Sequence, residues 1–192
     1  MAEFHLQPGD ALLLVDLQND FLPGGSLPVP HADQIIGPAN QWLERVNRAH
    51  LPTYATRDWH PHNHCSFTTH GGPWPPHCIV GSHGADFPET LNFNAKDSFT
   101  VINKGTTPEA EAYSGFEGTD LDVRLRNRRI RRLFVAGLAT DYCVLNTVLD
   151  ALRLGYEVTV LTRATRPVEL QPGDGERALE LMRTAGAKIS QA

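Results

Sequence analysis

Leu133–Val144 reads LFVAGLATDYCV, and this stretch decides the fold class: a short apolar run ends in a Gly-Leu-Ala-Thr-Asp turn, after which a helical pattern begins. A strand that turns directly into a helix is the repeating unit of an α/β sheet. The turn also carries a thiol, Cys143, at the expected start of the helix. The positive end of a helix dipole biases a thiol toward thiolate, so we expect Cys143 to be a nucleophile.

The same alternation runs through the rest of the chain. Short, β-branched-rich runs predict strands at Ala11–Val15, Leu51–Thr56, Phe99–Ile102, Leu133–Gly137 and Glu157–Leu161, with Ala187–Ser190 as a sixth. Amphipathic spacing predicts helices at Asp33–His50, Leu121–Arg129, Cys143–Leu154 and Asp174–Ala185. These elements predict one α/β domain spanning 1–192, with three α/β/α layers around a mainly parallel six-stranded sheet.

Composition excludes several function classes. The formal net charge of −5 argues against nucleic acid and anionic membranes as partners. Six arginines lie within Arg124–Arg132, but we interpret them as an exposed helix end rather than a nucleic-acid patch. No segment approaches the roughly 18 apolar residues of a transmembrane helix. We therefore expect a cytoplasmic protein that acts on small molecules.

Four polar residues fall at or just after the ends of expected strands. Asp16 directly follows the first strand, Asp58 and Lys104 come two residues after the second and third, and the Cys143 turn follows the fourth. Ligands in open α/β sheets bind at the carboxyl ends of strands, so these side chains should converge. A carboxylate that accepts a thiol proton and an ammonium that balances both anions suit nucleophilic attack on a carbonyl. The sequence thus predicts acyl transfer by Asp16, Lys104 and Cys143.

A histidine-rich segment, Asp58–His64 (DWHPHNH), adds a candidate metal site together with His77. Asp-x-His in an extended segment places both side chains on one face, and carboxylate and imidazole suit Zn²⁺, Fe²⁺ or Mn²⁺. By spacing alone, a solvated histidine loop remains an equal alternative.

Six motifs in order carry a family resemblance that covers nearly the whole chain: Val15–Gly25, Thr56–Phe67, Trp74–Phe87, Lys104-Gly105, Tyr113–Gly118 and Gly137–Val144. Through them the chain resembles the nicotinamidases of the isochorismatase-like cysteine hydrolase superfamily. The resemblance implies an isochorismatase-like fold, a catalytic triad and one divalent metal ion, Zn²⁺ before Fe²⁺ or Mn²⁺. The triad residues it implies are Asp16, Lys104 and Cys143. The metal ligands it implies are Asp58, His60 and His77, with His64 as candidate for a variable further ligand.

The resemblance also implies a reaction. Nicotinamide would be hydrolysed to nicotinate and ammonia through a Cys143 thioester, a step of NAD salvage, with pyrazinamide as a related substrate. A cis peptide between Leu138 and Ala139 would aim the Ala139 and Cys143 N–H groups into an oxyanion hole. Aromatic walls implied for the substrate ring are Phe21, Trp74 and Tyr113. Cys65 and Cys78 are expected to be spectators, and a homo-oligomer is a further expectation.

Three alternatives stay open. A related amidohydrolase for carbamoyl or ureido substrates would share Asp16, Lys104 and Cys143 but lack the Asp-x-His…His set. An isochorismatase proper would have a non-nucleophilic residue at Cys143. A metal-binding protein on the same fold would release no ammonia from nicotinamide.

Overall fold

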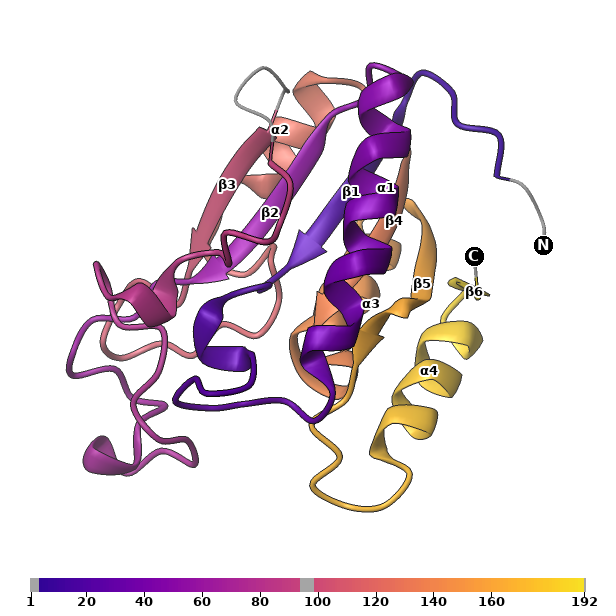
Figure 1. Cartoon of the computed structure of the whole chain (residues 1–192). Coiled ribbons are helices and arrows are strands. Elements are labelled where there is room, and N and C mark those ends of the chain that lie inside the picture. Colours follow the sequence, from indigo (N-terminus) through magenta and orange to yellow (C-terminus); the bar gives the residue numbers. More distant parts are fainter. Residues whose placement is uncertain (1–3, 94–98, 192) are drawn as a thin grey trace.

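A six-stranded parallel sheet forms the centre of the protein (Figure 1). The computed structural model describes residues 4–93 and 99–191, so the ends of the expected domain 1–192 lie outside the described residues. The strand order is β3-β2-β1-β4-β5-β6. The strands are β1 (Asp10–Val15), β2 (Thr53–Asp58), β3 (Phe99–Lys104), β4 (Arg132–Leu138), β5 (Glu157–Arg166) and β6 (Lys188–Ser190).

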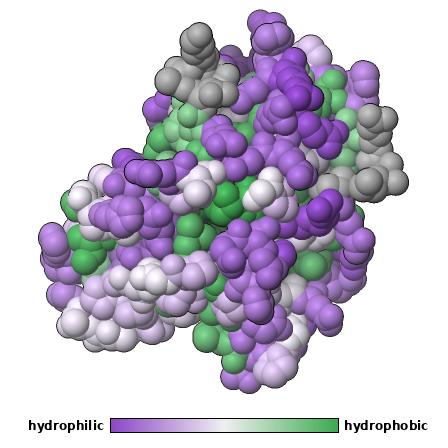
Figure 2. Space-filling view, viewed as in Figure 1, coloured by the Kyte–Doolittle hydropathy of each residue, from purple (hydrophilic) through white to green (hydrophobic). Residues whose placement is uncertain are grey.

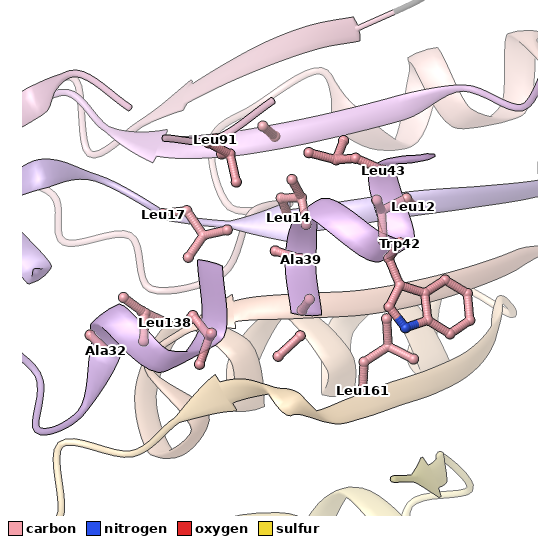
Figure 3. Close-up of a cluster of buried hydrophobic side chains, with 14 of the residues drawn as sticks. Leu12, Leu14, Leu17, Ala32, Ala39, Trp42, Leu43, Leu91, Leu138 and Leu161 are labelled. Atoms are coloured by element: carbon pink, nitrogen blue, oxygen red, sulfur yellow. The ribbon is translucent and has the colours of Figure 1, made fainter. Parts of the chain in front are cut away.

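Helices cover both faces of this sheet because its strands are apolar on both sides. On one face, α1 (Ile36–Arg48) packs Ala39, Trp42 and Leu43 against Leu12 and Leu14 (Figure 3). Leu13 and Val15 alternate to the other face, whose core includes residues of α2 (Leu121–Asn127), α3 (Leu145–Arg153) and α4 (Asp174–Thr184). Strands buried on both faces are typical of parallel sheets, so the expected α/β/α layering is confirmed.

The helix and strand predictions are confirmed, with differences at their ends. Asp58 and Lys104 are the last residues of β2 and β3 rather than residues beyond them, since backbone pairing of the two strands continues to this pair. The helix predicted from Cys143 begins as a π-helical turn, Thr140–Val144, and α3 starts at Leu145. Cys143 therefore lies inside a widened turn, not at the first position of a helix.

The strand order reverses at the centre of the sheet. From β1 the chain proceeds to β2 and β3 on one side, then crosses to β4, β5 and β6 on the other. Long loops gather at the end toward which the strand arrows point (Figure 1). A crevice at such a reversal is the usual ligand site of open α/β sheets, so the fold places Asp16 and the Cys143 turn there.

The outer surface has no extended apolar band on the face drawn in Figure 2, which is mostly hydrophilic with scattered hydrophobic residues. Within residues 4–93 and 99–191, none of the helices has the length and apolar character needed to cross a bilayer.

Candidate active site

The three residues predicted to act on a carbonyl lie together at the reversal of strand order. Asp16 follows β1 in a left-handed conformation (φ 48°) and is fully buried. Lys104 ends β3, and its Nζ lies 2.9 Å from Asp16 Oδ2 and 3.5 Å from Cys143 Sγ. Carboxylate and sulfur atoms of Asp16 and Cys143 lie within 4.8 Å of each other. The tertiary structure thus brings together residues that are up to 127 positions apart.

Lys104 has further partners that the sequence did not indicate. Its Nζ donates hydrogen bonds to Asp58 Oδ1 at 2.5 Å and to the Ala112 carbonyl at 2.8 Å. One buried ammonium therefore joins two carboxylates, Asp16 and Asp58, and also touches the sulfur. Among the described residues, Asp16 Oδ2 makes no hydrogen bond of good geometry despite its ion pair with Lys104. This oxygen is free to accept a proton.

The electrostatic environment shifts the pKa values of Asp16 and Asp58 in opposite directions. Burial raises the pKa of Asp16 and the nearby Asp58 adds to the rise, while Lys104 and the Thr56 hydroxyl act to lower it; the net shift is upward. Burial also acts to raise the pKa of Asp58, but Lys104 and His60 outweigh it and lower that pKa well below its usual range. Two carboxyls with pKa values pushed apart suit a division between a proton acceptor, Asp16, and a permanently charged ligand, Asp58.

The pKa of the Cys143 thiol differs from what the sequence led us to expect. Burial raises the pKa of Cys143 well above its usual value, and Asp16 and Asp58 raise it further, while Lys104 acts in the opposite direction. Because the sulfur is removed from water, the thiolate expected from the sequence is disfavoured. The free protein holds a neutral thiol that needs a base.

Asp58, His60 and His77 form a buried cluster whose ligand atoms lie within 4.8 Å of one another. His60 Nδ1 is bonded to the Gly105 carbonyl at 2.8 Å, and His77 Nδ1 to the Pro75 carbonyl at 2.7 Å. A carbonyl accepts only from an N–H, so both rings carry a proton on Nδ1, and Nε2 is the atom of each ring that could bind a metal. Backbone carbonyls that fix the tautomer in this way are usual around metal-binding histidines, so the residues fit a divalent cation.

His64 lies beside this cluster, stacked on His60 with ring centroids 3.9 Å apart. Its Nδ1 is bonded to Ser66 Oγ at 2.7 Å and its Nε2 to the Ala110 carbonyl at 3.1 Å, so both nitrogens have protein partners. His64 also forms a second potential ligand group with His60 and Glu111. The sequence did not single out Glu111.

A pocket reaches both the thiol and the histidine cluster. All three aromatic residues predicted from the resemblance line it, and Tyr142 is a fourth. Trp74 Nε1 donates to Tyr113 Oη at 3.1 Å, and Tyr142 packs edge-on to Trp74 at 5.2 Å. The full lining is Phe21, Leu27, Val29, Asp58, Trp74, His77, Glu111, Tyr113, Leu138, Ala139, Tyr142, Cys143 and Val168. Aromatic walls with a few polar groups suit a flat aromatic ring.

The peptide between Leu138 and Ala139 is cis, as the resemblance implied. Ala139 and Cys143 both line the cavity, which is where an oxyanion hole would have to be. Cys65 and Cys78 belong to none of the candidate ligand groups found among the described residues.

Two residues of the Asp16–Phe21 segment anchor the loops, and the sequence analysis missed them. Gln18 is fully buried, and its amide pairs with the backbone N–H and C=O of Asp58 at 2.8 Å each. Asp20 accepts the Cys78 N–H at 2.7 Å and the Ser26 N–H at 3.0 Å. In the sequence, the only indication of such a role for Gln18 and Asp20 was that they lie in a polar run between the first expected strand and a Pro-Gly loop. These contacts set the backbone positions of Asp58 and of the residue after His77.

Comparison with known proteins agrees with the fold and shows the family. The isochorismatase domain family matches residues 10–192. A nicotinamidase of Escherichia coli K12 is 41% identical, with 95% of this chain and 94% of that protein covered. The crystal structure of Pyrococcus horikoshii pyrazinamidase in complex with zinc has a TM-score of 0.90 at 46% identity, covering 96% of this chain and all of that one.

A second solved structure, PnC1 from L. infantum in complex with nicotinate, has a TM-score of 0.82 at 36% identity, with 95% and 92% of the two chains covered. The domain match spans nearly the whole chain, and the relatives match along nearly their full lengths. The chain belongs to the isochorismatase family.

Proposed function

We propose that this protein is a metal-dependent nicotinamidase that hydrolyses nicotinamide to nicotinate and ammonia through a Cys143 thioester. One observation carries the proposal: a single aromatic-lined cavity opens onto both the Cys143 thiol and the Asp58–His77 ligand cluster. The similar enzymes from E. coli, P. horikoshii and L. infantum, by their named activity or ligand, support the substrate class. The chain acts as one hydrolase domain, 1–192.

The site binds the ring before it acts on the amide. Phe21, Trp74, Tyr113 and Tyr142 enclose a planar ring, and they have few hydrogen-bond partners for a carbamoyl or ureido chain. A divalent cation held by Asp58, His60 and His77, of which Zn²⁺ suits the donor set, supplies a Lewis-acid contact for the ring nitrogen when it is bound. His64 remains a candidate further ligand.

Asp16 and Cys143 then perform acyl transfer. The Asp16 carboxylate takes the proton from the Cys143 thiol as sulfur attacks the amide carbon, and the Ala139 and Cys143 N–H groups hold the resulting oxyanion. Asp16 returns that proton to the leaving nitrogen, the C–N bond breaks, and ammonia departs. Asp16 next takes a proton from water, whose oxygen attacks the thioester. The C–S bond breaks, Asp16 returns that proton to the leaving sulfur to restore the thiol, and nicotinic acid departs and ionises to nicotinate. Lys104 remains protonated throughout, because Asp16 and Asp58 outweigh burial and raise its pKa.

Rapid-quench mass spectrometry tests this assignment. Wild-type protein mixed with nicotinamide should show a nicotinoyl adduct on the peptide that contains Cys143, and a coupled assay should show ammonia release. Cys143→Ala should lose turnover at constant metal content, whereas Cys65→Ala, which changes a half-buried cysteine outside the site, should retain it. Substantial turnover by Cys143→Ala would exclude the covalent route.

Pyrazinamide and a ureido substrate in parallel assays measure the breadth of the pocket, and a preference for the ureido substrate would favour the alternative amidohydrolase. Cytoplasmic location and homo-oligomer formation remain predictions.

A further inference from the structure

An open groove lined by arginines lies at the opposite end of the sheet from Cys143. It is formed where α2 ends and where β1 and β4 begin. Its walls include Arg126, Arg128, Arg129 and Arg131, with Ile130 and Pro8 as apolar surface. The chain carries a formal net charge of −5, so this concentration of positive charge contrasts with the whole molecule.

Acidic partners neutralise the arginines of this segment unevenly. Arg124 pairs with Asp120 at 2.8 Å, Arg126 with Asp122 at 2.9 Å, and Arg132 with Asp10 at 2.5 Å. No such ion pair involves the remaining three, Arg128, Arg129 and Arg131, within the part of the chain that the structure describes. These three are exposed and line the groove.

Arg129 occupies a backbone position at which glycine is the usual residue. The N–H of Ile130 bonds to the Leu125 carbonyl and that of Arg129 to the Arg126 carbonyl, both at 2.9 Å, which is the Schellman arrangement at a helix end. Arg129 occupies the left-handed position of this motif, with φ 55°. Glycine is the usual residue there, because a Cβ atom disfavours that conformation. An arginine is therefore tolerated where the backbone alone favours glycine.

Attraction to the negative end of α2 does not account for the whole set. A cation in the last turn of a helix is stabilised by the helix dipole, and this explains Arg128. Arg131 lies beyond the helix, and its guanidinium is directed over Gly9, where a Cβ atom would meet Arg131 Nε at 3.2 Å. The arginines of the groove therefore come both from the end of α2 and from the segment just before β4.

We infer that this groove binds a diphosphate group, either free or carried by a nucleotide. Guanidinium groups pair with phosphate oxygens through two parallel hydrogen bonds, and three of them without acidic partners match a compact anion of several charges. The exposed ring of Pro8 suits a nucleoside attached to that group. The site is distinct from the catalytic cavity, so it stands or falls independently of the proposed nicotinamidase activity.

Isothermal titration calorimetry with inorganic pyrophosphate on the full-length, metal-loaded protein tests the site. Saturable binding is expected, weakening as sodium chloride rises. The variant R128Q/R129Q/R131Q should bind at least about tenfold more weakly, since two or more charge-assisted contacts are lost. The matched control R153Q/R177Q/R183Q removes the same charge from ion-paired arginines of α3 and α4 and should change affinity less than about twofold. Chelation of the bound metal by pyrophosphate is common to both variants and cancels in their comparison.

A second variant distinguishes specific recognition of a diphosphate from general attraction by positive charge. R128K/R129K/R131K keeps the charge but loses the bidentate geometry, so it should bind with intermediate affinity, and it serves if the glutamine variant unfolds. ADP that binds more tightly than pyrophosphate identifies a nucleotide as the ligand, and equal affinities identify the free diphosphate. Absence of saturable binding, or equal weakening in the control variant, would overturn the inference.

Discussion

Lys104 Nζ donates a 2.5 Å hydrogen bond to Asp58 Oδ1, and this contact joins the nucleophile's charge network to the candidate metal ligands. The same Nζ lies 2.9 Å from Asp16 Oδ2. Because all three groups are buried, Asp16 depends on this ammonium for charge compensation, and Asp58 shares it while also facing His60. Lys104 is therefore a structural requirement of the site as well as a part of the proposed chemistry.

Replacement of Lys104 by methionine should destabilise the fold. Two buried carboxylates would lose their shared counter-charge, and breaking such a contact typically costs about 3–5 kcal/mol. Urea unfolding at neutral pH measures the change, on metal-loaded and on chelator-treated protein. Lys188→Met, on an exposed position of β6, is the control and should lie within about 0.5 kcal/mol of wild type. Equal stability of the two variants would show that Lys104 is not needed for charge compensation.

Thr56→Val should shift the pH dependence of catalysis. Thr56 Oγ1 donates to Asp16 Oδ1 at 2.7 Å and lowers the pKa of that carboxyl, whose larger perturbation is the rise caused by burial. Loss of this hydrogen bond raises the Asp16 pKa further. Asp16 accepts a proton only when ionised, so the acid limb of kcat/KM should move to higher pH. Profiles of ammonia release against pH provide the measurement.

Thr53→Val is the matched control on the same strand. Thr53 Oγ1 is buried and has no hydrogen-bond partner among the described residues. Removal of an unsatisfied hydroxyl should leave stability unchanged or raise it by about 1 kcal/mol, and the pH profile should not move. If both valine variants shifted the acid limb alike, the Thr56–Asp16 hydrogen bond would not be its cause.

His60→Ala and His77→Ala should lose most of the bound metal. A backbone carbonyl holds Nδ1 of each ring, and His60 Nε2 lies 3.6 Å from Asp58 Oδ2. His64→Ala should retain more than half of the metal, because both nitrogens of that ring already have protein partners. Elemental analysis after gel filtration measures the content per chain. A greater loss in His64→Ala than in His77→Ala would reverse the ranking of these ligands.

Gly84→Ala should disturb the loop beneath the metal cluster. A Cβ atom there would lie 2.1 Å from Asp20 Oδ2, the atom that accepts the Cys78 N–H beside His77. Displacement of Asp20 should cost about 1–3 kcal/mol and weaken metal retention. Thermal unfolding and elemental analysis report both effects.

Gly37→Ala tests whether that cost comes from crowding. Gly37 lies in α1, and its added Cβ would meet nothing within 4 Å. Alanine in an exposed helix is favoured over glycine by up to about 1 kcal/mol, so this variant should be equal to wild type or more stable. Destabilisation of similar size in both variants would contradict the crowding argument.

Much of the fold was predictable because its signals are local. The apolar runs of the six strands and the amphipathic spacing of α1 and α4 depend on neighbours within a few residues, and their positions were predicted closely. Element ends were less accurate, since the pairing of Asp58 with Lys104 that extends β2 and β3 is a contact between strands distant in sequence.

The sequence by itself determined the succession of strands and helices along the chain, the family, and the polar residues at the strand ends. Only the tertiary structure decided that Lys104 joins Asp16 to Asp58, that Tyr142 completes the aromatic wall, and that the Cys143 thiol is neutral at rest. The physical reason is burial: removal from water sets a pKa and makes an ion pair strong, and burial depends on segments that only the folded chain brings together.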